Sequence, residues 1–364
     1  MTTPKRALIA AGGTGGHMFP ARAAAQELAT RGWEVRLVTD ARGMKHTEGF
    51  PAVSVDPIKA ASPVTKNPVK LVSAWMQLLS GLMSCRRIIR QWKPDVVAGF
   101  GGYPAFPALM AARQKKIPFA IHEQNAVLGR VNRVFAKQAG FVASGFERLD
   151  RAPKKARRLI TGNPVRPPLV EARATPYPGE DGPIRIFVLG GSLGARILSE
   201  TVPAAIAELP EWLRSRLDVA QQTREESLPM ARDIYQSAGV NAVCEPFFDD
   251  VADRLAAAHL VIARAGASSV SEIACVGRPV IFVPLAIAAD DHQTANAEGL
   301  AEAGAADSIP EREFSVQALA ALLEVRLANH ADLADRAARA KAVGRPDAAS
   351  LFADALISLE QENR

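Results

Sequence analysis

Two glycine-rich turns, one in each half of the chain, have the residue types that suit binding of a phosphate group. The first is residues 12–17 (GGTGGH), after the apolar run 7–11, and the second is residues 190–195 (GGSLGA), after 184–189. Without Cβ atoms in the way, backbone N–H groups and the positive end of a helix can approach an anion. The two turns predict two nucleotide-binding domains that face each other across a cleft, an arrangement typical of an enzyme that joins two substrates.

His17 ends the first turn, and a histidine beside four glycines faces whatever the turn holds. We therefore expect a functional role for His17 rather than a purely structural role at the start of a helix. The spacing differs from the G-x-G-x-x-G pattern of nicotinamide-binding folds. Asp40 nevertheless stands where such a fold places its acid, so an oxidoreductase stays open as an alternative.

Two further polar turns follow expected strands in the first half. They are residues 100–103 (FGGY) and 122–125 (HEQN). Because ligands gather at the carboxyl ends of parallel strands, we expect these turns to converge with the first glycine turn. The structural alternative is that Glu123 and Asn125 only cap the next helix.

In the second half, Ser269 and Glu272 follow an expected strand at 260–263. Their S-x-x-E spacing predicts a capping box, which alone could explain both residues, although the helix start also directs positive charge at a ligand. Asp290 and Asp291 are not expected to hold a metal, because the other acidic ligands are missing. Helix ends, with Arg166 or Arg196, would neutralise a pyrophosphate instead.

These residues must be positioned by a parallel sheet wrapped by helices, because short aliphatic runs alternate with Ala/Leu-rich stretches throughout. The expected strands are 7–11, 34–39, 96–99, 119–122 and 141–143, then 185–189, 217–221, 243–245, 260–263 and 279–283. The expected helices include 19–31, 69–92 and most of 315–362, broken at 344–346. The class is α/β. The Pro/Gly-rich segment 162–168 predicts a boundary between domains 1–162 and 163–345. Separately, we expect a final helix at 346–364 to pack back on the first domain.

The expected helix 69–92 is apolar around most of its circumference and follows the capping pair Asn67-Pro68. Its uncharged stretch 71–85 is shorter than the roughly 18 residues that span a bilayer. Either it is a core helix, or it lies on an anionic surface with the flanking basic residues Lys66, Lys70, Arg86, Arg87 and Arg90.

Composition limits the class of protein. The chain has 364 residues, 48% hydrophobic and 23% charged, which is enough for two globular domains. Its net charge of +6 favours an anionic partner. Nucleic acid is not expected, because the basic residues are scattered without an aromatic-basic recognition motif. Three cysteines without metal-ligand spacing predict a reducing compartment, and the N-terminus does not resemble a signal peptide.

Taken together, seven ordered motifs resemble the MurG family of bacterial UDP-N-acetylglucosamine:undecaprenyl-diphospho-muramoyl-pentapeptide N-acetylglucosaminyltransferases. The motifs are GGTGGH at 12–17, GGY at 101–103, HEQN at 122–125, GNPVR at 162–166, GGS-x-GAR at 190–196, GA-x-x-VSE at 266–272 and DHQTANA at 291–297. The resemblance covers nearly the whole chain. It implies a GT-B glycosyltransferase fold of two Rossmann-like domains, with an acceptor-binding and membrane-facing first domain and a second domain that binds UDP-GlcNAc.

The resemblance also implies roles for individual residues. Ser192 would contact the diphosphate, Phe248 and Glu272 the uridine, and Gln293 the GlcNAc hydroxyls. The full implied substrate-binding set is Thr14, Gly15, Gly16, Asn125, Arg166, Ser192, Phe248, Ala267, Ser268, Ser269, Val270, Ser271, Glu272 and Gln293. No metal and no cofactor are implied.

The implied reaction is inverting transfer of GlcNAc to the 4-hydroxyl of the muramoyl sugar of lipid I, giving lipid II. It needs a base near that hydroxyl and stabilisation of the leaving diphosphate. His17 is the candidate base, with Glu123 or His122 as alternative or orienting partner. The implied partners are UDP-GlcNAc, lipid I, the anionic cytoplasmic face of the inner membrane and cell-wall synthesis proteins. A non-catalytic nucleotide-sugar-binding subunit and a glycosyltransferase with another lipid acceptor remain as alternatives.

Overall fold

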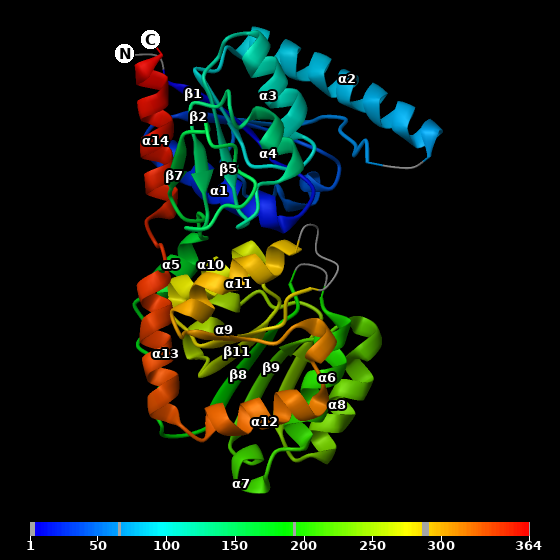
Figure 1. Ribbon diagram of the computed structural model, residues 1–364, viewed down its shortest axis with the longest axis vertical. Helices are drawn as coiled ribbons and strands as arrows, with labels where there is room; N and C mark the ends of the chain where they lie inside the picture. Colours follow the sequence, from blue (N-terminus) through cyan, green and yellow to red (C-terminus); the bar gives the residue numbers. More distant parts are fainter. Residues whose placement is uncertain (1–3, 65–66, 192–193, 286–290, 364) are drawn as a thin grey trace. The chain divides into compact units, whose positions relative to one another are not determined.

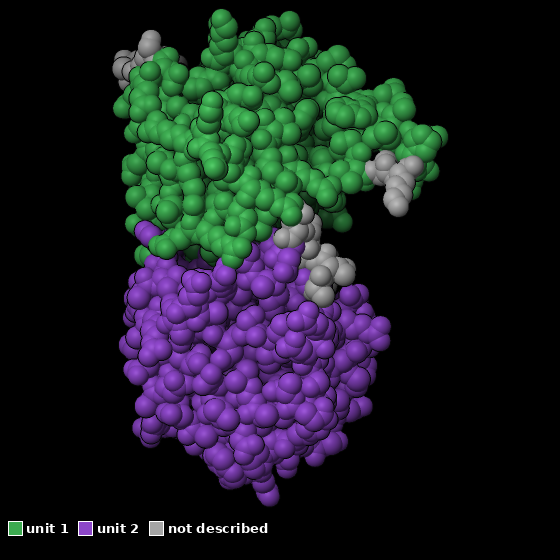
Figure 2. Space-filling view, in the orientation of Figure 1, with its two compact units in different colours: residues 1–166, 346–364 green, residues 167–345 purple. Residues whose placement is uncertain are grey.

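Two parallel sheets organise the protein. The structure is a computed structural model that describes residues 4–64, 67–191, 194–285 and 291–363. Two compact units divide the chain: residues 1–166 with 346–364 form the first, and residues 167–345 form the second (Figure 2). The chain therefore returns to the first unit at its end.

The first unit contains a sheet with the strand order β3-β2-β1-β4-β5-β6-β7 in its described part. The strands are β1 (Arg6–Ala10), β2 (Glu34–Thr39), β3 (Ser54–Pro57), β4 (Val96–Gly99), β5 (Phe119–Glu123), β6 (Val142–Ser144) and β7 (Arg158–Ile160). Its helices are α1 (Gly15–Thr30), α2 (Pro68–Trp92), α3 (Ala105–Gln114), α4 (Arg130–Phe135) and α14 (Ala348–Glu362), with a 3-10 turn at Gly43–His46.

Helices cover both faces of this sheet. Along β1, Ala7 and Ile9 pack into a core shared with α1 and α14, whereas Leu8 and Ala10 pack into a second core with α2, α3 and α4. Successive residues of a strand point to opposite faces, so a strand buried on both sides must be apolar throughout. The last helix, α14, lies beside α1, which brings the two ends of the chain together (Figure 1).

The second unit repeats this plan with the strand order β10-β9-β8-β11-β12-β13. The strands are β8 (Ile184–Leu189), β9 (Leu217–Gln222), β10 (Asn241–Glu245), β11 (Leu260–Ala263), β12 (Val280–Phe282) and β13 (Ala306–Ser308). The helices are α5 (Pro167–Ala172), α6 (Arg196–Ala207), α7 (Glu211–Arg214), α8 (Leu228–Ser237), α9 (Val251–Ala257), α10 (Ala267–Val276), α11 (His292–Glu302), α12 (Val316–Leu327) and α13 (His330–Val343), with 3-10 turns at Glu225–Ser227 and Glu311–Glu313.

Each sheet reverses its strand order once. The reversal lies between β1 and β4 in the first unit and between β8 and β11 in the second. Ligands of open parallel sheets bind at such a switch point, beyond the carboxyl ends of the strands. The two glycine turns follow β1 and β8, so both stand at a switch point.

All ten expected strands are confirmed to within two residues, but three short strands, β3, β7 and β13, were not predicted. Helix α1 begins at Gly15, earlier than the expected residue 19, so His17 lies in its first turn. The second unit begins at Pro167 rather than at residue 163. The reason is that Asn163 Nδ2 donates to the main-chain oxygen of Gln124, which ties this segment to the first unit.

Helix α2 has two apolar faces. As expected, Asn67 caps it, with Oδ1 accepting from the N–H groups of Val69 and Lys70. One face, including Leu78, Cys85 and Ile89, is buried against the first unit. The other face carries the exposed residues Val69, Val72, Trp75, Met76, Leu79 and Met83. None of the helices in the described residues has the length and apolarity to cross a bilayer.

Candidate functional site

The turn after β1 is held by a side chain from the neighbouring strand. Asp40, which follows β2, is buried and accepts from Gly13 N at 3.0 Å and Gly43 N at 2.9 Å. Gly13 has a φ of +90°, which only glycine adopts without strain. Thr14 is the N-cap of α1 but makes no side-chain cap bond. The first N–H groups of α1, from Gly15 and Gly16, therefore face the switch point as a potential anion site.

His17 lies half-buried at this point, between the turns that follow β4 and β5. Its Nδ1 is 2.9 Å from Oε1 of Gln124. A Cβ on Gly101 would lie 3.1 Å from Cε1 of His17, so the imidazole ring packs directly against a glycine backbone. The structure thus brings together the first three polar turns, as the sequence predicts.

Glu123 is buried and fully hydrogen-bonded. Its Oε1 accepts from Asn125 N at 3.1 Å and Asn125 Nδ2 at 3.3 Å. Its Oε2 accepts from Gly129 N and Asn132 Nδ2, both at 2.8 Å. A carboxylate offers about four lone-pair positions, and here four donors occupy them. The carboxylate therefore organises the loop between β5 and α4.

His122 is entirely buried beneath this loop. Its ring stacks on Phe100 at 5.2 Å and meets the edge of Phe352, from α14, at 5.4 Å. Nε2 lies 3.0 Å from the Gly162 carbonyl oxygen, and Nδ1 lies 3.1 Å from Gln124 Nε2. Burial lowers the pKa of His122 to about 4, so the ring is neutral at physiological pH.

The turn after β8 is held in the same manner as the first turn. Gln222, at the end of β9, accepts from Gly190 N at 3.0 Å and donates to the carbonyl oxygens of Gly191 and Pro246. Ser192 lies outside the described residues. Arg196, which begins α6, pairs with Glu200 one turn later.

The start of α10 differs from the expected capping box. The helix begins at Ala267 with Gly266 as its N-cap, without a side-chain cap bond, so Ser269 and Glu272 lie inside the helix. The capping-box prediction is therefore wrong. Ser268 Oγ is buried and has no hydrogen-bond partner among the described residues. An orphaned hydroxyl at an open helix start is typical of a ligand-binding site.

Phe248 and Gln293 lie at the same end of the second sheet. The Phe248 ring packs 5.7 Å from Phe187 and beneath the Arg254 guanidinium, so little of the ring is exposed. Gln293, in the first turn of α11, accepts from Leu285 N at 2.9 Å. Asn296 joins α11 to the loop after β11 by donating to the Ala265 carbonyl oxygen.

Arg166 belongs to the first unit, where its guanidinium lies 5.1 Å from the centre of the Phe19 ring. Asp291 occupies the N-cap position of α11 with a φ of +53° but makes no side-chain cap bond, and Asp290 is outside the described residues. Among the described residues, no three His, Cys, Asp or Glu side chains group as metal ligands.

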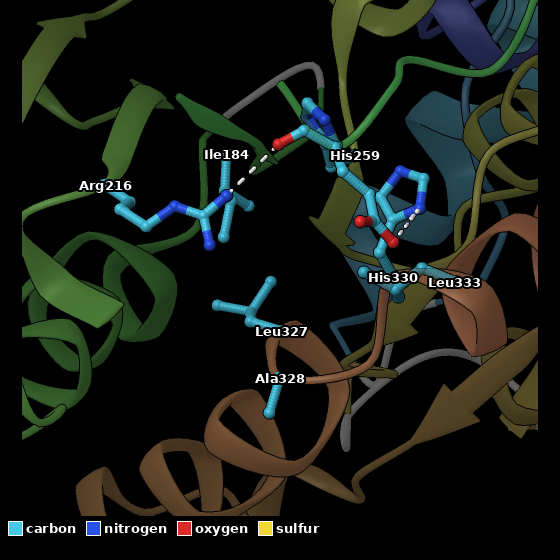
Figure 3. Close-up of a pocket in the computed structure, with 8 residues that line it drawn as sticks. Ile184, Arg216, His259, Leu327, Ala328, His330 and Leu333 are labelled. Atoms are coloured by element: carbon cyan, nitrogen blue, oxygen red, sulfur yellow. Dashed lines mark hydrogen bonds and ion pairs between the residues drawn. The ribbon is translucent and has the colours of Figure 1, made fainter. Parts of the chain in front are cut away.

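A cavity of about 140 Å³ lies elsewhere in the second unit (Figure 3). It opens beside Ile184, Arg216 and His259, which stand at the amino ends of β8, β9 and β11. His259 accepts from Arg185 N through Nδ1 and faces the Gly179 carbonyl oxygen through Nε2. The cavity is therefore at the opposite end of the sheet from the switch point. Its second histidine, His330, lies with Nε2 2.9 Å from the Pro178 carbonyl oxygen, so both histidines are hydrogen-bonded within the chain.

Sequence reasoning missed the residues that position the others. Gln124 links His17 to His122, and Asn132 and Gln222 hold the loops around them. Gln124 stands within the recognised HEQN motif, so the motif drew attention to the segment without indicating this residue's role.

Comparisons with known proteins agree over the whole chain. Residues 7–144 match the N-terminal domain of glycosyltransferase family 28, and residues 185–352 match its C-terminal domain. A Maricaulis maris protein is 67% identical over 98% of both chains, and a Phenylobacterium zucineum protein is 49% identical over 96% of this chain and 97% of its own. Both are named UDP-N-acetylglucosamine--N-acetylmuramyl-(pentapeptide) pyrophosphoryl-undecaprenol N-acetylglucosamine transferase.

Solved structures give the same result. MurG of Acinetobacter baumannii is 32% identical, with a TM-score of 0.79 over 98% of this chain and 100% of that one. A UDP-GlcNAc 2-epimerase from Neisseria meningitidis, 13% identical with a TM-score of 0.70, shares the fold alone. The expected fold class, two Rossmann-like α/β domains of the GT-B type, is confirmed. With both domain models matched and a 67% identical relative along its length, the chain belongs to the MurG family within glycosyltransferase family 28.

Proposed function

We propose that this protein transfers GlcNAc from UDP-GlcNAc to the 4-hydroxyl of the muramoyl sugar of lipid I, forming lipid II in peptidoglycan synthesis. The observation that carries the proposal is the end-to-end match, at 67% identity, to a relative named for this transfer. The open helix starts and glycine turns at both switch points support it, because a nucleotide diphosphate sugar needs such anion sites.

The reaction is a single in-line displacement with inversion at the anomeric carbon. The base takes the proton of the acceptor hydroxyl while that oxygen forms the new bond to C1 of GlcNAc. The bond from C1 to the diphosphate oxygen breaks, and UDP leaves with its electron pair. Donors directed at the leaving diphosphate lower the barrier, because negative charge develops there.

His17 is the base that the arrangement favours. Glu123 has donors on all its lone-pair positions, and His122 is buried with both ring nitrogens engaged. His17 is half-buried at the switch point, and only its Nδ1 is directed at Gln124. Thr14, Gly15, Gly16 and Asn125 would approach the substrates beside it.

The donor would be held mainly by the second unit. The N–H groups of 267–269 and the buried Ser268 hydroxyl would bind the nucleotide. The Glu272 carboxylate would accept hydrogen bonds from the ribose hydroxyls. Phe248 would contribute through its backbone, because its ring is packed against Phe187. Gln293 would contact the GlcNAc hydroxyls through the amide that also binds Leu285. Val270, Ser271, Arg166 and Ser192 complete the proposed set.

The exposed face of α2 would dock on the anionic cytoplasmic face of the inner membrane, where lipid I and cell-wall synthesis proteins are found. Its exposed apolar residues recur at helical spacing, and Lys70, Arg86, Arg87 and Arg90 are exposed at the two ends. An apolar stripe flanked by basic residues suits a helix lying in the interface of an anionic bilayer. This would place the enzyme as a peripheral membrane protein.

The proposal is tested by incubating the protein with UDP-GlcNAc and a short-chain lipid I analogue. We expect equimolar release of UDP and formation of the GlcNAc-MurNAc disaccharide. UDP-GlcNAc binding without transfer to lipid I would contradict the acceptor assignment and indicate another lipid acceptor or a binding subunit. Failure to bind UDP-GlcNAc, with NAD bound instead, would indicate the oxidoreductase. The structure disfavours that outcome, because Asp40, the acid that would bind the ribose of NAD, already accepts hydrogen bonds from two N–H groups of its own chain.

A further inference from the structure

A line of hydrogen bonds within the first unit runs from His17 into the core. His17 Nδ1 lies 2.9 Å from Gln124 Oε1. Gln124 Nε2 lies 3.1 Å from His122 Nδ1 and 3.2 Å from the His122 carbonyl oxygen. His122 Nε2 lies 3.0 Å from the Gly162 carbonyl oxygen. The direction of each bond follows from which atoms can only accept.

The His122 carbonyl fixes the orientation of the Gln124 amide. A carbonyl oxygen only accepts, so the amide end beside it must be the donating NH2 group. The amide oxygen therefore faces His17, and it too can only accept. His17 Nδ1 must then carry a proton and donate it to Gln124.

We propose that Gln124 is a positioning residue that holds neutral His17 in its Nδ1–H tautomer, leaving the lone pair on Nε2 for the acceptor hydroxyl. The catalytic consequence rests on the proposed function, whereas the tautomer itself is a property of the free protein. A neutral imidazole can accept a proton only at its unprotonated nitrogen. Without Gln124, both tautomers of His17 would be accessible, and only one could act as the base.

At the buried end of this line of hydrogen bonds, the donor and acceptor roles of the His122 nitrogens are also fixed. The Gly162 carbonyl requires His122 Nε2 to donate, so neutral His122 offers Nδ1 as an acceptor for Gln124. Burial keeps this ring neutral at physiological pH, as its lowered pKa of about 4 indicates. Phe100 and Phe352 contact its ring.

Two neighbouring residues, Asn163 and Gly101, hold Gln124 and His17 in place. Asn163 Nδ2 donates to the Gln124 main-chain oxygen at 2.9 Å. The Gly101 backbone lies so close to the His17 ring that a Cβ there would be 3.1 Å from Cε1 and 3.2 Å from Nδ1. The ring therefore has little room to turn away from Gln124.

The tautomer is tested by NMR on protein labelled with 15N-histidine, with long-range 1H–15N correlations recorded at mildly alkaline pH. The His17 signals are assigned by their loss in His17→Ala. We expect a protonated, pyrrole-type Nδ1 and an unprotonated, pyridine-type Nε2. The reverse pattern would overturn the proposal. This wild-type spectrum decides the tautomer whether or not any Gln124 variant folds.

Kinetics test the consequence. In Gln124→Leu we expect kcat to fall about tenfold or more, with KM for UDP-GlcNAc within about twofold. Its His17 spectrum should show a mixture of tautomers. Gln26→Leu, the same change at an exposed position of α1, is the matched control and should leave both readouts unchanged.

The two proposals fail in different ways. Wild-type protein that transfers GlcNAc but shows His17 in the Nε2–H form overturns the role of Gln124 and leaves the function intact. Wild-type protein in the Nδ1–H form that performs no transfer overturns the function. A Gln124→Leu variant with unchanged kcat and an unchanged His17 spectrum also overturns the role of Gln124.

Discussion

The titratable side chains around the first glycine turn differ in how many of their lone pairs the protein itself uses. Glu123 accepts four hydrogen bonds, and both nitrogens of His122 are engaged. A general base needs a lone pair that the substrate can reach. Glu123 and His122 therefore organise the site rather than accept the proton. Among these three residues, only His17 lies at the switch point with a single described side-chain hydrogen bond.

His122 should make stability depend on pH. Its folded pKa of about 4 lies below the value of about 6.5 for an unfolded histidine. Between these values the unfolded state binds the proton and the folded state does not. The free energy of unfolding should therefore fall as the pH drops from about 6.5 toward 4, by up to about 3 kcal/mol from this group.

The measurement is urea unfolding of wild type and His122→Phe between pH 7.5 and about pH 5. The variant should be less stable at neutral pH, because it loses two hydrogen bonds, but its stability should vary less with pH. Histidine His259, whose pKa burial also lowers, is common to both proteins and cancels in the difference. Parallel pH curves would contradict the assignment.

The role of Gln124 shows where sequence reasoning ends at this scale. The glycine spacing and the polar turns suffice to predict that His17, Glu123 and Asn125 meet, because parallel strands end at one edge. Which of them retains a lone pair depends on donors from Gly129, Asn132 and other distant positions. That information is absent from any one motif.

At the scale of elements, both glycine turns use the same device. A polar side chain at the end of the neighbouring strand, Asp40 beside β1 and Gln222 beside β8, accepts an N–H group of the turn. The remaining N–H groups at the helix starts are then available to an anion. The two units thus hold their glycine turns in the same way, although one uses a carboxylate and the other an amide.

Helix α2 should determine binding to membranes. Met76→Ser with Leu79→Ser removes two exposed apolar side chains without touching the buried face. We expect binding to vesicles containing phosphatidylglycerol to weaken about 30-fold or more, because the lost apolar contact with lipid contributes roughly 1 kcal/mol or more for each of the two side chains. The fold should be unchanged.

Vesicle sedimentation measures this binding, and Val325→Ser is the matched control, an equally exposed apolar residue in the second unit. Equal loss in both variants, or no loss in either, would show that α2 is not the docking face. Vesicles of phosphatidylcholine should bind all the proteins weakly, because they lack the anionic charge that the basic ends of α2 require.

Most of the strands that the sequence analysis predicted are more buried than the strands it missed. Strands such as β1 and β11 are buried on both faces and appear in the sequence as continuous apolar runs. By contrast, β3 and β7 are short and partly exposed, so their sequences show no such run. The start of α10 was misplaced because an S-x-x-E spacing also occurs inside helices.

At the scale of the whole molecule, the chain builds one unit from its two ends. Helix α14 returns to pack on α1, and its Phe352 reaches the rings of Phe100, Phe141 and His122. The C-terminal helix therefore supports the core beneath His17. The sequence analysis expects this helix to pack on the first domain, but local sequence patterns do not encode which rings it contacts there. The Pro/Gly-rich segment 162–168 did indicate the region where the second unit begins.

The two units also divide the proposed work. The candidate base, His17, belongs to the first unit, whereas Glu272 and Gln293, proposed to bind the donor, belong to the second. Removing the base should therefore slow the chemical step without weakening donor binding. This separation is the central claim of the proposed mechanism.

The most direct test is to measure kcat for GlcNAc transfer and the calorimetric Kd for UDP-GlcNAc in His17→Ala and wild type. We predict that kcat falls about 100- to 10,000-fold, the usual contribution of a general base, while Kd stays within about twofold. Unchanged kcat, or a loss that appears entirely as weaker UDP-GlcNAc binding, would contradict the assignment of His17 as the base.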